Sequence, residues 1–84
     1  MAQMLSSMPL ATGLAATDLM AMSLWVASLA LGGNLSHEQV VDVAGGTQLL
    51  SPHEFDVLAQ VLNEWHLDHG GNHPVPYAHG LPPA

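Results

Sequence analysis

The chain contains no lysine, no arginine and no cysteine among its 84 residues. Without lysine or arginine it cannot neutralise phosphate groups, so nucleic-acid binding and polybasic binding to a membrane surface are excluded. The same absence excludes an arginine clamp on an anionic substrate and a P-loop lysine. Because there is no cysteine, the chain has no disulfide framework and no thiolate metal site.

Acidic side chains therefore set the charge of the protein. The net charge is −7 at pH 7, and the carboxylates belong to Asp18, Glu38, Asp42, Glu54, Asp56, Glu64 and Asp68. Six histidines are the only side chains that can become positive, and protonating all of them would reduce the net charge to −1. Since imidazole titrates near pH 6.5, we expect solubility and partner binding to change most between about pH 7 and 5.5.

The size and composition are typical of one small globular domain. The hydrophobic content of 49% is too high for a disordered chain. No segment alternates polar and apolar residues for long enough to predict a strand, so we expect an all-α fold. The predicted helices span about 9–31, 36–44 and 51–68, within a single domain of residues 1–71. Residues 72–84, rich in proline, glycine and histidine, are expected to form an extended tail.

Polar caps and glycine pairs define the ends of these helices. Ser36 with Gln39, and Ser51 with Glu54, have the spacing of a capping box, in which two side chains satisfy N–H groups reciprocally. Glycine pairs are expected to stop all three helices through left-handed caps, at positions 32–33, 45–46 and 70–71.

The first predicted helix is almost entirely apolar. Asp18 is its only charge, Thr17-Asp18 is a second candidate helix start, and no charge follows from Leu19 to Leu31. One interpretation is a core helix or a helix docked on a partner. The less favoured one is membrane placement, because Asp18 interrupts the segment and no Lys or Arg flanks it. No secretory signal is expected, since the N-terminus lacks the required positive side chains.

The third predicted helix has one apolar and one polar face. We assign Asp56, Gln60, Asn63 and Glu64 to the solvated side. Large apolar residues of the first and third helices should be buried internally or against a partner, and the tryptophans are natural anchors. The candidate partner-binding residues are Trp25, Leu29, Phe55, Leu58, Leu62 and Trp65.

Histidines are concentrated at the end of the third helix and in the tail. His66, His69 and His73 are spaced densely enough to bind Zn²⁺, Ni²⁺ or Cu²⁺, and His66 and His69 lie one helical turn apart. The alternative is that these side chains are solvated, or that they interact favourably with the negative end of the helix dipole. The spacing alone leaves both interpretations open.

Catalysis has little support in the sequence. There is no cysteine nucleophile and no catalytic lysine, and Ser51 is better explained as a helix cap than as a nucleophile. We therefore expect no enzyme activity and no catalytic residue. The sequence favours a small acidic interaction protein, such as an accessory subunit, an inhibitor or a scaffold. Its partner would be a protein with a basic or apolar surface, and self-association or membership of a larger assembly is expected.

Residues 35–46 read LSHEQVVDVAGG and carry a leucine-serine pair, an acidic residue, two spaced valines and a terminal glycine pair. This segment resembles the double-glycine leader of bacteriocins and other ribosomally made peptides, although Gln39 stands where a second acidic residue is common. The resemblance implies cleavage after Gly46, with Gly45 and Gly46 as the processing site and a released peptide beginning at Thr47. Helix capping alone also accounts for the leucine, the serine and the glycines.

Overall fold

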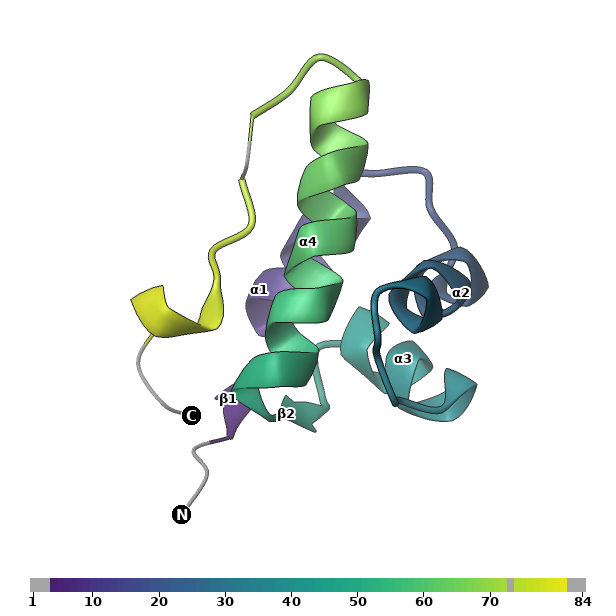
Figure 1. Ribbon diagram of the computed structural model, residues 1–84, viewed down its shortest axis with the longest axis vertical. Coiled ribbons are helices and arrows are strands. Elements are labelled where there is room, and N and C mark those ends of the chain that lie inside the picture. The colour runs from purple at the N-terminus through teal and green to yellow at the C-terminus, as the bar shows by residue number, and fades with distance from the viewer. Residues whose placement is uncertain (1–3, 73, 82–84) are drawn as a thin grey trace.

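The computed structural model describes residues 4–72 and 74–81. This part of the chain forms a compact helical domain with a short two-stranded sheet, which confirms the expected all-α class (Figure 1). The elements in chain order are β1 (Leu5–Ser6), α1 (Met8–Ala15), α2 (Ala21–Ala30), α3 (His37–Ala44), β2 (Leu49–Leu50), α4 (Pro52–Asp68) and the 3₁₀ turn η1 (Ala78–Gly80).

The apolar segment predicted as one helix over 9–31 is two helices, so that prediction was wrong. The Thr17 hydroxyl donates to the carbonyl of Leu14 at 2.7 Å and accepts from the amide of Leu19 at 3.1 Å. A threonine that binds the backbone on both sides replaces the partners that a continuous helix would need. The chain therefore leaves α1 after Ala15 and starts α2 at Ala21.

The other two helices begin where their caps predicted. At α3 the capping box is complete, because Gln39 N donates to Ser36 Oγ at 3.2 Å and Ser36 N donates to Gln39 Oε1 at 2.9 Å. At α4 only half of the box forms. Ser51 Oγ accepts from Glu54 N, while the Glu54 carboxylate accepts instead from the amide of Asn34 at 2.8 and 3.2 Å. Glu54 thus ties the α2–α3 loop to the start of α4.

Glycine ends α2, α3 and α4 in the same way, as expected. Gly32, Gly46 and Gly70 follow these helices with φ angles of +89°, +77° and +85°, a conformation that a Cβ atom disfavours. Each is part of a Schellman motif: at α3, Thr47 N donates to Asp42 O and Gly46 N donates to Val43 O. The final carbonyls of these helices are thereby satisfied without any basic side chain.

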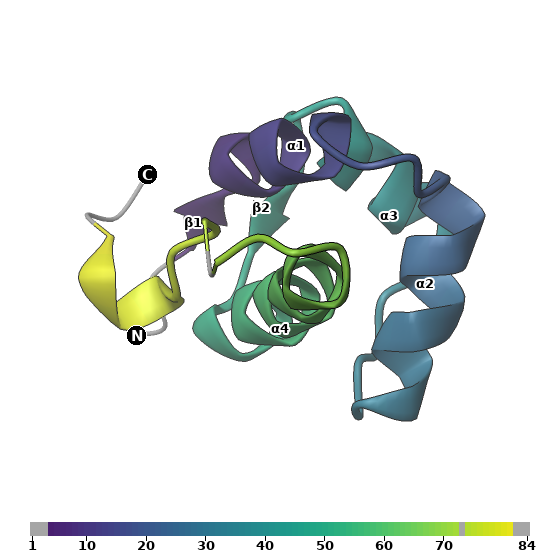
Figure 2. The same ribbon diagram turned by 90° about the horizontal axis from the view of Figure 1, so that it is seen from above.

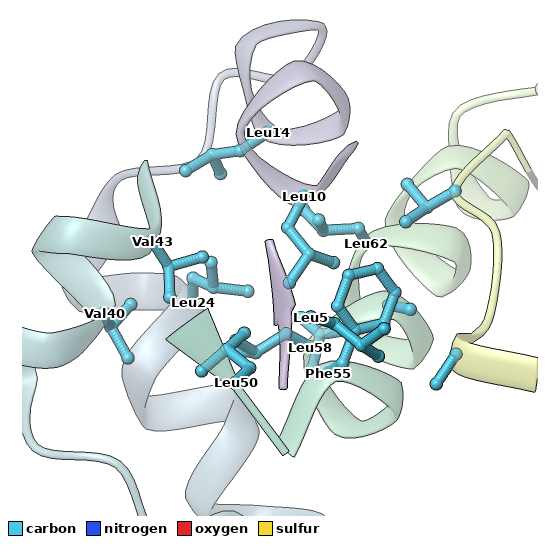
Figure 3. Packing of buried hydrophobic residues seen from close by; sticks show 14 residues of the cluster. Leu5, Leu10, Leu14, Leu24, Val40, Val43, Leu50, Phe55, Leu58 and Leu62 are labelled. Carbon is cyan, nitrogen blue, oxygen red and sulfur yellow. The ribbon is translucent and has the colours of Figure 1, made fainter. Parts of the chain in front are cut away.

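The hydrophobic core lies where α4 meets the N-terminal half of the chain. Figure 3 shows side chains from β1, α1, α2, α3 and β2 converging on those of α4. The pairing of Leu5 with Leu50 in the sheet closes the lower end of this core. The largest buried apolar residues are Leu10, Leu24, Val40, Val43, Leu50, Phe55, Leu58 and Leu62.

The C-terminal tail was expected outside the domain, but part of it belongs to the core. After α4 the chain turns and runs back beside this helix, on the side away from α2 (Figures 1 and 2). Val75 is 2% exposed, and its N–H and C=O bind the side-chain amide of Asn63, both at 2.9 Å. Asn63 was assigned to the solvated face and is instead 1% exposed. This reciprocal pair fastens the tail to α4.

Candidate interaction surface

Helix α2 lies at the edge of the molecule, with α3 and α4 packed against it (Figure 2). Its inner face carries Leu24 and Ser28, which are almost fully buried. Its outer face carries Met22, Val26 and Leu29 at the i, i+4, i+7 spacing of one helical stripe. The helix is therefore apolar on both faces, and only one face is covered.

The outer face of α2 is strongly exposed. Met22 and Val26 are each 56% exposed and Leu29 is 46% exposed. Met20, at the N-cap, and Leu31, at the C-cap, are also exposed, at the two ends of the helix. We call the stripe of Met22, Val26 and Leu29 the α2 face. Single exposed apolar residues are ordinary, whereas a continuous apolar stripe on a small protein marks an interaction site.

The chain segments next to α2 expose acidic side chains. Helix α3, which packs against α2, exposes Glu38 and Asp42, and Asp18 is exposed just before α2 begins. The chain contains no Lys or Arg that could neutralise them. The charged side chains exposed on α3 and just before α2 are consequently all acidic.

Three of the six candidate partner-binding residues lie inside the domain. Phe55, Leu58 and Leu62 are at most 1% exposed, so they stabilise the core rather than contact a partner. Leu29 is a candidate that remains exposed, as part of the α2 face. Met22 and Val26 were not among the candidates. The signal that could have identified them is that α2 has no polar side for solvent, which requires an apolar face to remain outside.

Trp25 is half-buried and acts within the fold. Its indole Nε1–H donates to the carbonyl of Leu35 at 2.9 Å, and its ring lies 5.5 Å from the ring of His37. These contacts join α2 to the segment that leads into α3. The indole therefore holds the α2–α3 loop, which limits its role as an anchor for a partner.

Trp65, His66 and His69 form an aromatic cluster at the end of α4. The ring of His69 stacks on Trp65 with a centroid distance of 3.8 Å, and His66 meets the same indole edge-on at 5.1 Å. His69 Nδ1 lies 2.8 Å from the carbonyl of Trp65, and His66 Nε2 lies 3.4 Å from the carbonyl of Gly13. One nitrogen of each imidazole is thus directed at a backbone carbonyl.

The predicted metal ligands do not assemble into a site within residues 4–72 and 74–81. No group of three His, Cys, Asp or Glu side chains there could hold a metal ion. His73, the third predicted ligand, lies outside the described residues. What the structure shows of His66 and His69 is their packing around Trp65.

Gly45 and Gly46 form the turn between α3 and β2. Gly45 is the C-cap, and Gly46 adopts the positive φ of the Schellman motif. A Cβ atom on Gly46 would also collide with the sulfur of Met8, so this glycine allows α1 to approach the turn. The peptide bond after Gly46 lies between two parts of one core, since Val43 precedes it and Leu50 follows it.

Two further findings bear on function. No helix in the described part of the chain is both long and apolar enough to cross a membrane. Comparison of the chain with protein-family models, with curated proteins and with solved structures finds no match. The functional argument therefore rests on the residues and their geometry.

Proposed function

We propose that this protein is a non-enzymatic acidic binding protein that docks the α2 face on a partner protein. The observation that carries the proposal is that α2 is apolar on both faces while its outer stripe of Met22, Val26 and Leu29 remains exposed. Covering such a stripe removes apolar surface from water, which is the main driving force for association.

The partner surface is inferred from complementarity. An apolar strip would cover the α2 face, and Lys or Arg side chains around that strip would meet Glu38, Asp42 and Asp18. A second copy of this chain is disfavoured as the occupant, because each copy carries a net charge of −7 and no basic side chain. The proposal therefore commits to a different protein with a basic rim.

The test compares two doubly substituted chains expressed with a tag in the native host. Met22→Ser/Val26→Ser alters the centre of the α2 face. Met4→Ser/Val41→Ser is the control, which makes the same two kinds of change at exposed positions just before β1 and on α3. We expect the first variant to lose a specifically captured partner by at least about tenfold, since two well-covered apolar side chains contribute over about 1.4 kcal/mol. The second variant should retain that partner.

Two measurements can overturn the proposal. Light scattering of the purified chain should give the mass of a monomer, about 8.8 kDa. A dimer that dissociates in Met22→Ser/Val26→Ser would show that a second copy covers the α2 face. Flotation with phosphatidylcholine vesicles should leave the protein unbound, and binding lost in the same variant would assign the face to a lipid surface. Equal capture by both variants would also contradict the proposed role.

A further inference from the structure

A groove opens beside α4, between the C-terminal end of α2 and the tail. Its volume is about 420 Å³, and its lining residues are Leu31, His53, Asp56, Val57, Gln60 and Tyr77. Leu31 is the C-cap of α2, so the groove lies at the end of the helix that carries the proposed docking surface. Apolar walls and polar groups therefore meet at one place on the surface.

Most of the polar groups in the groove already have partners. Tyr77 donates its hydroxyl to Gln60 Oε1 at 2.7 Å, and Gln60 Nε2 donates to Glu64 Oε1 at 2.8 Å. His53 Nε2 lies 3.4 Å from the carbonyl of Gly32. These contacts hold the walls of the groove in place. Because these three side chains already have hydrogen-bond partners, they are poor candidates for binding a further ligand.

Asp56 differs from the other groove residues. Its Oδ1 accepts the amide N–H of Ala78 at 2.7 Å, while Oδ2 accepts no hydrogen bond within residues 4–72 and 74–81. The side chain is half-buried, and no Lys or Arg exists in the chain to pair with it. A partly desolvated carboxylate interacts more strongly with an external cation than a fully solvated one does. Glu54, in the first turn of α4, offsets the positive end of this helix.

We propose that the groove takes up the side chain of a lysine or arginine from the partner protein. Asp56 Oδ2 would accept a hydrogen bond from the cationic end, and the aliphatic stem would lie against Leu31 and Val57. Tyr77, whose hydroxyl is already engaged, lines the same space, and its aromatic ring would add a cation–π contact. This inference rests on the proposed function and names the chemistry of one partner residue.

The experiment uses the complete chain, labelled with ¹⁵N, and two small probes. N-acetyl-arginine amide carries the cation, and N-acetyl-citrulline amide is its neutral counterpart of similar shape. At pH 8 and low salt, we expect saturable shifts of the Asp56, Val57 and Ala78 amide signals, with affinity for the arginine probe in the roughly millimolar range. The citrulline probe should bind about fivefold more weakly.

Matched variants test the carboxylate itself. Asp56→Asn removes the charge but keeps an oxygen that can accept the Ala78 N–H, so the tail should stay in place. We expect its affinity for the arginine probe to fall about fivefold, to that of citrulline. Asp68→Asn removes the same charge at the exposed end of α4 and should leave affinity within about twofold, because solvent screens distant charges. Equal binding of both probes, or equal losses in both variants, would overturn the inference.

The two proposals fail in different ways. Met22→Ser/Val26→Ser should bind the arginine probe as the unmodified chain does while it loses the partner. If the probe does not bind but this variant still loses the partner, the groove inference alone is wrong. If the probe binds as expected and the variant keeps the partner, the proposed use of the α2 face alone is wrong.

Discussion

Helix α2 and the C-terminal tail reverse what their compositions suggest. The helix carries no charge, with only two serines among mostly apolar residues, yet its outer stripe is about half exposed. The tail has four prolines, yet Val75 is 2% exposed and Ala78 is 9% exposed. An apolar segment was left partly outside, while a segment that resembles a linker entered the core.

The difference shows that a segment becomes buried when other elements offer groups for it to pack against or bind. Helix α4 presents Asp56, Gln60 and Asn63 at the i, i+4, i+7 spacing, and each of these side chains binds the tail. Asn63 and Asp56 satisfy backbone groups of a segment that forms little secondary structure of its own, and Gln60 accepts from the hydroxyl of Tyr77. Within the described residues, no element offers α2 a second apolar surface. The comparison can be tested by substitutions that affect either α2 or the attachment of the tail.

The largest effect is expected inside α2. Leu24→Ala removes a side chain that is 0% exposed and should lower the free energy of unfolding by about 3 kcal/mol. Met22→Ala on the outer face should change it by less than about 0.5 kcal/mol. Urea denaturation of both variants measures the contrast. Similar losses would mean that the outer face is covered within the isolated chain.

Asn63→Ala tests the attachment of the tail. The substitution leaves the buried N–H and C=O of Val75 without partners, so we expect a loss of about 2 kcal/mol and faster hydrogen exchange at the Val75 amide. Asn72→Ala, at an exposed position, is the control. Unchanged exchange at Val75 in the Asn63 variant would show that the tail is held mainly by other contacts.

Gly32→Ala and Gly70→Ala compare the chain segments that follow α2 and α4. Both glycines have positive φ, and a Cβ added at either would meet no atom within 4 Å, so each substitution should cost about 1 kcal/mol through the backbone alone. Gly80→Ala, where φ is not positive, should be close to neutral. Thermal unfolding of the three variants suffices. A clearly larger loss at one glycine would reveal a packing role there.

Tyr77→Phe should have the smallest effect. It removes the hydroxyl that donates to Gln60 at 2.7 Å in a half-exposed setting, and we expect a loss of about 0.5 kcal/mol. The Val75 amide should stay protected from exchange, because Asn63 still binds it. Loss of that protection would show that Tyr77, rather than Asn63, fixes the position of the tail.

Local chemistry made most of the helices predictable. Ser36 and Ser51 cap the helices that follow them, and glycine ends three helices, because these interactions involve residues only a few positions apart. The apolar face of α4, with Phe55 and Leu58, was likewise predictable from its spacing. Such features depend little on the rest of the fold.

The remaining features depend on distant residues. The pairing of Leu5 with Leu50 joins strands of two residues each, which is too short for an alternating pattern to appear. Asn63 looked solvated because its partner, Val75, lies twelve positions away in a proline-containing segment. Predicting the α2 face would have required knowing which side of α2 packs against the core. Its position opposite Leu24 became clear only once the helices were packed.

The contact between Asn63 and Val75 has one more consequence. A primary amide offers a donor and an acceptor side by side, as a backbone peptide unit does, so α4 pairs with the tail much as a neighbouring strand would. Because both hydrogen bonds involve main-chain atoms, the pairing does not depend on which side chain is present at position 75. Gly13 leaves just enough room for the side chain of Val75, since a Cβ at position 13 would lie 2.5 Å from a methyl carbon of Val75. The volume of residue 75 is thus restricted, whereas Pro74 and Pro76 on either side of it are exposed.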